Sequence, residues 1–292
     1  MKVLITGAGG QLAYELARTA PEDVEYRALA RADLDISNKD AVEALINGYQ
    51  PDAVINAAAY TAVDKAESES DTAFSVNEQG VENLAFACAK LDCYFLHVST
   101  DFVFDGRANR PYTPDDLPAP VNVYGHSKLA GEQAVYAKKP KQSAIIRTAW
   151  VYSSHGKNFV KSLLHYMAER PELNIVVDQL GTPTWAYGLA EVCWQAVGAR
   201  IEGTYHWSDA GVASWYDFTE AIQLLGVENG LIESERCVLN AIPTEDYPTP
   251  ATRPVYTVLD KRKTLEALPG IKNVHWQKQL GLMIKELTEL RK

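Results

Sequence analysis

The chain has 292 residues, a length that suits one large domain or two closely joined ones. Its 47% hydrophobic and 23% charged residues are typical of a globular protein and exclude an intrinsically disordered chain. The formal net charge of −10 argues against a general binder of nucleic acid or of anionic membranes, although a few local donors can still hold a phosphate.

The first half of the chain alternates short apolar runs with longer helical patterns. Strands are predicted at residues 2–6, 24–30, 52–58, 93–99 and 143–151. Helices are predicted between them at residues 10–20, 39–48, 69–91 and 124–138. Repeated strand–helix–strand units require a parallel sheet with helices on both faces. The sequence therefore predicts a Rossmann-like, doubly wound α/β fold, whose ligand lies at the carboxyl ends of the strands.

After about residue 151 the pattern is less regular and richer in aromatic residues and prolines. Strands are predicted there at 173–178, 203–209 and 238–242, and helices at 156–169, 185–199, 214–225 and 273–291. The proline-rich stretch 243–254 is predicted to be a loop. We expect a dinucleotide-binding domain over residues 1–150. A smaller, mainly substrate-binding domain should occupy residues 151–292, with some of its helices packing back on the sheet.

A glycine-rich turn, TGAGGQLA (6–13), follows the first predicted strand and opens the first predicted helix. Gly7 and Gly10 allow a tight turn and let backbone N–H groups approach a pyrophosphate, whose charge the helix N-terminus favours. The small Ala13 lets the helix pack closely on the strand. Such turns also occur without a ligand, but the position of this one at the start of an alternating pattern favours a dinucleotide site.

The residues after the second predicted strand bear on the choice of cofactor. An acid there typically holds the ribose 2′-hydroxyl of NAD. Here Arg27 and Arg31 come before Asp33 and Asp35, and arginine pairs well with a 2′-phosphate. The sequence favours NADPH, and the two carboxylates also allow NADH.

The fourth predicted strand ends in Ser99, Thr100 and Asp101, at the edge where the ligand is expected. Tyr124 and Lys128, in YGHSK, are four residues apart and so share one face of a predicted helix. A carbonyl reductase needs such a set. Tyr124 would be the general acid and Lys128 the ammonium that lowers the pKa of the phenol and holds the nicotinamide ribose, while Thr100 orients the substrate oxygen. Tyr-x3-Lys alone also recurs by chance, and Thr100 also suits a turn cap.

Several stretches together resemble one family, over nearly the whole chain. They are TGAGGQL (6–12), NAAAYTAVDKAE (56–67), STDFVF (99–104), NVYGHSKLAGE (122–132), RTAWVY (147–152), DQLGTPT (178–184) and YPTPATRP (247–254). On these motifs the chain resembles the dTDP-4-dehydrorhamnose reductases, which are extended short-chain dehydrogenases/reductases. The resemblance implies reduction of the C4 ketone of dTDP-4-dehydro-β-L-rhamnose to dTDP-β-L-rhamnose. That reaction is the last step in making activated rhamnose for cell-surface polysaccharides.

The resemblance also implies which residues contact the ligands. The implied cofactor contacts are Gly7, Gly10, Gln11 and Leu12 at the pyrophosphate, Asp35 and Ile36 at the adenine, and Ala57, Ala59, Tyr60 and Thr61 along the third strand. The implied sugar contacts are Val63, Thr100, Asp101, Phe102 and Trp150. Phe102 stands where the family commonly has a tyrosine, so one possible hydroxyl contact is missing. We assign Arg253 to the diphosphate of the substrate.

Some members of this family bridge two subunits with Mg²⁺ held by glutamates. Glu15 matches one of those positions, but Tyr187 stands where another glutamate is expected. Losing a carboxylate weakens a site for a hard cation. We therefore expect no structural metal, a monomer or weak homodimer, and a solvated Glu15 on the first helix.

Three rival functions fit the same fold. A nucleotide-sugar 4,6-dehydratase places an acid–base pair directly after the threonine, whereas here Phe102 follows Asp101. A 4-epimerase would differ in the sugar nucleotide that it binds. A non-catalytic, NADP-binding regulatory homologue, like the regulatory subunit of methionine adenosyltransferase, would keep the fold without turnover. The intact set of Thr100, Tyr124 and Lys128 favours the enzyme.

The sequence also suggests where the protein works. Its four cysteines show neither a C-x-x-C pair nor a zinc spacing. No stretch reaches the ~18 uninterrupted apolar residues of a membrane span, and the chain begins on a predicted strand rather than on a leader. We expect a cytoplasmic protein with a nucleotide-sugar substrate and no nucleic-acid or membrane partner.

Overall fold

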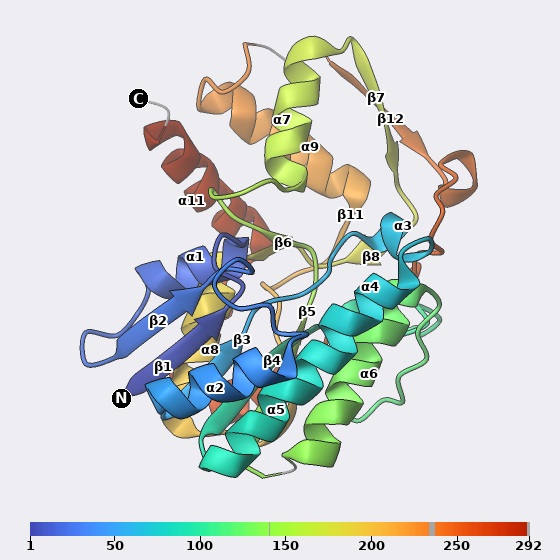
Figure 1. Ribbon diagram of the computed structural model, residues 1–292. Coiled ribbons are helices and arrows are strands. Elements are labelled where there is room, and N and C mark those ends of the chain that lie inside the picture. Colours follow the sequence, from blue (N-terminus) through green and yellow to red (C-terminus); the bar gives the residue numbers. More distant parts are fainter. Residues whose placement is uncertain (140, 234–236, 291–292) are drawn as a thin grey trace.

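The computed structural model describes residues 1–139, 141–233 and 237–290, and its centre is a six-stranded parallel sheet (Figure 1). The strand order is β10–β5–β4–β3–β1–β2. The strands are β1 (Lys2–Thr6), β2 (Glu25–Leu29), β3 (Ala53–Asn56), β4 (Tyr94–Thr100), β5 (Ser143–Thr148) and β10 (Gly203–His206). The order reverses between β1 and β3, and in doubly wound sheets ligands bind at such a switch point. The predicted fold class is confirmed.

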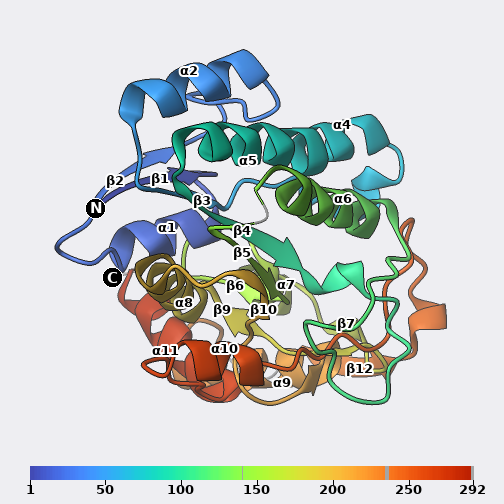
Figure 2. The ribbon, with the colours of Figure 1, turned by 90° about the horizontal axis from the view of Figure 1, so that it is seen from below.

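Helices cover both faces of this sheet, as Figure 2 shows. One face carries α2 (Lys39–Tyr49), α4 (Ser70–Phe74), η1 (Ser75–Gln79), α5 (Gly80–Leu91) and α6 (Val123–Lys138). The other carries α1 (Gln11–Arg18), α8 (Ala186–Ala199) and α10 (Arg262–Ala267). Successive strand residues point to opposite faces. In β1, Leu4 therefore packs under α2 and α5, whereas Val3 and Ile5 pack under α1 and α8. Burial on both faces explains why the central strands β1, β3 and β4 are largely apolar.

The C-terminal half forms a second apolar core beside the sheet. It is built from α7 (Phe159–Glu169), α9 (Trp215–Glu228), α11 (Trp276–Glu289) and the parallel pair β7 (Glu172–Val176) and β12 (Val238–Ile242). Two short pairs accompany it, β6 (Val151–Tyr152) with β9 (Thr184–Trp185) and β8 (Leu180–Gly181) with β11 (Ala213–Ser214). Within the described ranges, no helix is both long and apolar enough to cross a bilayer.

Some predicted boundaries of helices and strands are wrong, because local backbone turns and pairing with distant strands change where the elements end. The strand predicted at 143–151 breaks between β5 and β6, because Trp150 has a left-handed φ of 46°. The strand predicted at 203–209 joins the main sheet as β10 beside β5, so the sheet reaches beyond residue 150. The helix predicted at 69–91 contains the π-helical turn η1. Of the helix predicted at 273–291, residue 291 lies outside the described residues.

Several short elements were not predicted, and the predicted loop 243–254 is largely confirmed. Three of the unpredicted elements are the helical segments α3 (Val63–Ala66), the 3₁₀ turn η2 (Asp101–Val103) and α10. Each has six residues or fewer, too short to show a helical period. The loop contains one 3₁₀ turn, η3 (Thr244–Asp246).

Close packing of α6 on η1 gives the first prediction. A Cβ on Gly131 would lie 2.1 Å from the backbone oxygen of Asn77, so Gly131→Ala must push the two segments apart. We expect the free energy of unfolding, measured by urea denaturation, to fall by about 1–3 kcal/mol. Gly48→Ala in α2 is the control, because no atom lies within 4 Å of its Cβ position, and it should not destabilise. Equal effects of the two changes would contradict the packing described here.

Candidate active site

A cavity of about 830 Å³ opens at the carboxyl ends of the central strands. Every residue assigned above to the cofactor, to catalysis or to the sugar lines it. Arg27 and Asp33, the other two residues weighed for cofactor choice, are not among its lining residues. Lys157 and Trp215 line the cavity as well, and sequence reasoning missed both. Neither has a local signal, because each reaches the cavity only through the packing of the C-terminal half.

The glycine turn forms one wall of this cavity. Gly7 has a φ of 83°, and a Cβ there would lie 2.7 Å from the backbone nitrogen of Ala58. Any side chain at this position would therefore push β1 and β3 apart. Helix α1 starts after Gly10 without a side-chain cap and without an acidic residue in its first turn. Its N-terminal N–H groups thus face the cavity unopposed by a protein carboxylate, and this arrangement fits a diphosphate.

The end of the cavity beside β2 carries Arg31 and Asp35. The Arg31 side chain is 77% exposed and lies 3.7 Å from the Asp35 carboxylate, so it is held only loosely. Hydrogen bonds from the hydroxyl and backbone N–H of Ser37 hold the pKa of Asp35 below its usual value. An exposed guanidinium that makes only one long contact with a carboxylate fits a 2′-phosphate.

Thr100 and Tyr124 are brought together by the packing of α6 on η2. Asn122 caps α6, because its Oδ1 accepts from the backbone N–H of Gly125 at 2.8 Å. A Cβ on Gly125 would lie 2.3 Å from the backbone oxygen of Phe102, so only glycine permits this approach. Thr100 caps η2 by accepting from the backbone N–H of Phe102 at 3.3 Å, and it also lines the cavity. Thr100 therefore combines the two roles predicted for it, since it caps a turn and also faces the cavity.

The proton states of the buried residues differ from the sequence expectation. Burial raises the pKa of Tyr124 to about 12, whereas Lys128 was expected to lower it. Burial also lowers the pKa of Lys128 to about 8, and its Nζ donates to the backbone oxygen of Val98 at 2.8 Å. The expectation of a depressed tyrosine pKa is therefore wrong for the free chain, because desolvation dominates. A protonated Tyr124 at neutral pH is nevertheless the state that a proton donor requires.

Asp101 is a buried acid beside these residues. Its side chain is nearly inaccessible, and burial raises its pKa to about 6. Oδ1 accepts from the Thr100 hydroxyl at 3.0 Å, whereas Oδ2 makes no well-formed hydrogen bond within the described chain, although the nearby Thr257 side chain lowers the pKa of the carboxyl. An unpaired buried oxygen in the lining of a cavity is a candidate contact for a ligand.

Arg253 lines the cavity but is already paired. Its guanidinium donates to both carboxylate oxygens of Asp64, at 3.0 and 2.9 Å. Asp64 comes from the TAVDKAE stretch and also accepts from the backbone N–H of Ala251. The pair therefore fastens the C-terminal segment to α3 at the cavity rim. Contact between Arg253 and a diphosphate remains a prediction.

An aromatic stack forms the wall of the cavity on the C-terminal side. Trp150 and Trp215 lie face to face, with ring centroids 3.6 Å apart. A Cβ on Gly181 would lie 2.6 Å from the Trp150 ring. The Trp150 ring is therefore in close contact with Gly181 as well as with Trp215. The left-handed backbone of Trp150 turns this ring away from the strand direction of β5 and into the stack.

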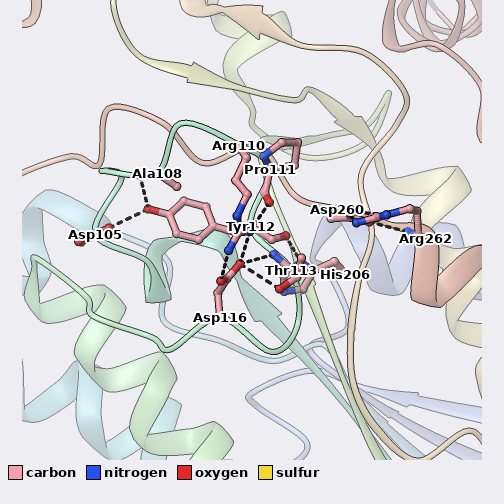
Figure 3. A network of polar contacts seen from close by, with 10 residues as sticks. All are labelled: Asp105, Ala108, Arg110, Pro111, Tyr112, Thr113, Asp116, His206, Asp260 and Arg262. Carbon is pink, nitrogen blue, oxygen red and sulfur yellow. Dashed lines mark hydrogen bonds and ion pairs between the residues drawn. The ribbon is translucent and has the colours of Figure 1, made fainter.

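The loop that follows η2 is held by the polar network in Figure 3. The Tyr112 hydroxyl donates to Asp105 at 2.7 Å, and its carbonyl accepts from Nδ1 of His206 at 3.0 Å. Arg110 makes two hydrogen bonds to Asp116, at 2.8 and 2.6 Å. These contacts anchor the loop to β10 and fix the segment that begins at the cavity.

Comparison with known proteins places the chain in a family. The family model described as the RmlD substrate binding domain matches residues 1–289. This chain belongs to the RmlD family. The RmlD relative from Aggregatibacter actinomycetemcomitans, a dTDP-4-dehydrorhamnose reductase, is 43% identical over 287 residues, which is 96% of this chain and 97% of the relative.

Solved RmlD structures agree along the whole chain. The dTDP-4-dehydrorhamnose reductase from Clostridium acetobutylicum superposes with a TM-score of 0.92 at 40% identity, covering 98% of this chain and 99% of that one. The enzyme from Bacillus anthracis, solved in complex with NADP, gives a TM-score of 0.90 at 33% identity with the same coverage. The family resemblance predicted from the motifs is confirmed.

Glu15, the residue compared above with the metal-bridged members of the RmlD family, is not solvated as predicted. It is fully buried and accepts from the Ser153 hydroxyl at 2.6 Å. Arg18 pairs with it at 2.8 Å and with Glu286 of α11 at 2.6 Å, and lies 5.0 Å from the centre of the Tyr187 ring. These partners satisfy the buried carboxylate, and the sequence could not reveal them because Glu286 lies in the last helix.

These residues do not fit the Mg²⁺ that bridges some RmlD subunits. The carboxylates of Glu15 and Glu286 are both bonded to the Arg18 guanidinium, and a divalent ion next to this cation would be repelled. Within the described part of the chain, no group of three or more His, Cys, Asp or Glu side chains is arranged to hold a metal ion.

Arg18 gives the second prediction. Arg18→Met leaves the buried Glu15 without its cation, so the free energy of unfolding should fall by about 2 kcal/mol, below the full cost for a completely buried pair. Arg27→Met, which changes an exposed arginine of β2, should alter the free energy of unfolding by less than about 0.5 kcal/mol.

EDTA or Mg²⁺ should change neither the melting temperature nor the mass in solution of the unmutated protein. A rise in either on adding Mg²⁺ would show that a metal does bind.

Proposed function

We propose that this protein reduces the C4 ketone of dTDP-4-dehydro-β-L-rhamnose with NADPH to give dTDP-β-L-rhamnose, the last step of dTDP-rhamnose biosynthesis. One observation carries the proposal. The glycine turn, Arg31 and the set Thr100, Tyr124 and Lys128 line a single cavity in a member of the RmlD family. The relative from Aggregatibacter actinomycetemcomitans is named for this reaction, and the Bacillus anthracis homologue was solved with NADP.

The cofactor would lie along the carboxyl ends of β1, β3 and β4. Gly7, Gly10, Gln11 and Leu12 surround the place for its pyrophosphate at the N-terminus of α1. Arg31 is placed to meet a 2′-phosphate, which supports NADPH over NADH, while Asp35 and Ile36 border the adenine and Ala57, Ala59, Tyr60 and Thr61 follow β3. Bound NADPH supplies the hydride that turns the ketone into a secondary alcohol.

The chain's own residues would supply the proton and hold the substrate oxygen. The Tyr124 hydroxyl gives its proton to the oxygen as negative charge develops there. The Thr100 hydroxyl donates to the same oxygen and orients the carbonyl. Lys128 contacts the nicotinamide ribose and returns a proton to the Tyr124 phenolate. One hydride and one proton together convert the ketone to the alcohol.

The sugar nucleotide would occupy the part of the cavity between the two halves of the chain. Val63, Asp101, Phe102 and Trp150 border it, and Arg253 lies at the rim for the diphosphate. This supports a cofactor role for residues 1–150 and mainly a substrate role for 151–292, although β10 and α8 serve the sheet. We also propose a cytoplasmic location, which suits four cysteines that are all unpaired and buried.

Two rivals from the sequence differ from this proposal at named residues. A 4,6-dehydratase needs a base after Asp101, and Phe102 packs there edge-on to Tyr124 with ring centroids 5.6 Å apart. A non-catalytic homologue would not need a buried tyrosine, lysine and threonine around one cavity. Oxidation of NADPH that depends on added dTDP-4-dehydrorhamnose tests all the alternatives together, because neither a dehydratase nor a 4-epimerase consumes the cofactor.

The acid assignment gives the third prediction. Tyr124→Phe keeps the ring but removes the proton donor, so kcat should fall by about 10²-fold or more. The Kd for NADPH, measured by fluorescence titration, should change little. Near-normal turnover of this variant would refute the role of Tyr124.

Cofactor choice gives the fourth prediction. Arg31→Ala should raise KM for NADPH and leave KM for NADH nearly unchanged, as expected when a ground-state contact to the 2′-phosphate is lost. Arg27→Ala, which changes an arginine of β2 outside the cavity lining, is the matched control and should affect neither cofactor. An equal effect of Arg31→Ala on both cofactors would mean that Arg31 acts structurally.

A further inference from the structure

A row of buried polar side chains crosses the sheet from β1 to β4 and ends at Lys128. Thr6, Asn56 and His97 are neighbours in the strand register of β1, β3 and β4, and all are fully buried. The Thr6 hydroxyl donates to Oδ1 of Asn56 at 2.6 Å, and Nδ2 of Asn56 lies 3.0 Å from Nδ1 of His97. Nε2 of His97 lies 3.4 Å from Nζ of Lys128. No residue of the row other than Lys128 has a role in the reaction proposed above.

The direction of these hydrogen bonds can be assigned from the network. Oδ1 of Asn56 accepts from the Thr6 hydroxyl and from the backbone N–H of Ala58 at 3.2 Å. Nδ2 therefore faces His97, and because an amide nitrogen only donates, Nδ1 of His97 must accept. A neutral imidazole has one N–H, so His97 carries its proton on Nε2 and points it at Lys128.

This tautomer bears on the charge of Lys128. An ammonium has three N–H donors and no acceptor, so it cannot bond to the Nε2–H of His97. A neutral amine has a lone pair that can accept from Nε2–H while one of its own hydrogens goes to the backbone oxygen of Val98 at 2.8 Å. We propose that His97 is a positioning residue that holds Nζ of Lys128 beside the cavity and weakens its hold on a proton.

The titratable groups on the neighbouring elements are Glu132, Tyr124 and Asp101. Glu132 lies one turn further along α6 and favours the ammonium, but its carboxylate is paired with Arg147 through two hydrogen bonds of 2.9 and 2.6 Å. Tyr124, one turn before Lys128, stays protonated at neutral pH because burial raises its pKa to about 12, whereas Asp101, whose pKa burial raises to about 6, is mostly ionised. Burial and the neighbouring Lys128 hold the pKa of His97 well below its usual value, so the imidazole stays neutral.

The inference rests on the proposed function and deepens it. After Tyr124 has given its proton to the substrate oxygen, one proton must return to the phenolate. It moves from Nζ of Lys128 to the Tyr124 oxygen, and the amine that remains is stabilised by the Nε2–H of His97. Solvent then restores the proton on Lys128. The row from Thr6 to His97 thereby sets how readily the enzyme recovers its acid.

The experiment is NMR spectroscopy on the free protein, so its result does not depend on turnover. With ¹⁵N-labelled histidine, and His97→Phe to assign the signal, His97 should be the Nε2–H tautomer and stay neutral between about pH 6 and 9. An Nδ1–H tautomer, or protonation in this range, would overturn the proposal. If the reductase assay failed while this tautomer was found, only the proposed function would fall.

A designed reversal of the tautomer completes the test. In Asn56→Asp, Oδ1 still accepts from Thr6, but the other oxygen now requires an N–H on Nδ1 of His97. Nε2 then accepts from the ammonium, so the pKa of Lys128, followed by ¹³C NMR of its Cε, should rise by about one unit or more. In the His97→Phe background the same aspartate should have a much smaller effect. Equal shifts in both backgrounds would show that the charge of the aspartate, and not His97, is responsible.

Discussion

The close approach of α6 to the end of β4 is the contact on which the cavity depends. It requires a residue without a side chain at Gly125, because the backbone oxygen of Phe102 occupies the space of a Cβ. Asn122 caps the same helix end, and its Nδ2 donates to the backbone oxygen of Thr252 at 2.7 Å. One short turn therefore sets the distance from Tyr124 to Thr100 and also draws the C-terminal segment over the site.

Burial, more than charge pairing, sets the proton states around this contact. It raises the pKa of Tyr124 and of Asp101 and lowers that of Lys128. All three shifts favour uncharged forms, as expected where water is excluded. A site of this kind keeps the phenol of Tyr124 protonated until a substrate oxygen becomes negative, and it then stabilises the new charge with a few fixed donors.

Sequence reasoning succeeded where the signal is local and failed where partners are distant. The glycine turn, the alternation of strands and helices and the Tyr-x3-Lys spacing each lie within a few residues, and together they predicted the fold and the lining of the cavity. Glu15 was misjudged because one of its charged neighbours, Glu286, lies in the last helix. The pairing of Arg253 with Asp64 likewise joins residues 189 positions apart. The pKa of Tyr124 was misjudged because spacing gives the neighbours of a group but not its desolvation.

The cavity gathers positive charge on a chain whose formal net charge is −10. Arg31, Lys128, Lys157 and Arg253 all line it, against the carboxylates of Asp35 and Asp101 and that of Asp64, which is paired with Arg253. The field of an exposed charge fades over roughly 10 Å at 0.1 M salt, so a dianion near the opening responds to these residues rather than to the distant acidic surface. A net negative charge disfavours non-specific binding of polyanions, while the basic residues that line the cavity favour a small anion there. The placement of basic residues inside the cavity of an acidic chain thus favours small anions over large ones, before any contact with a base or a sugar is made.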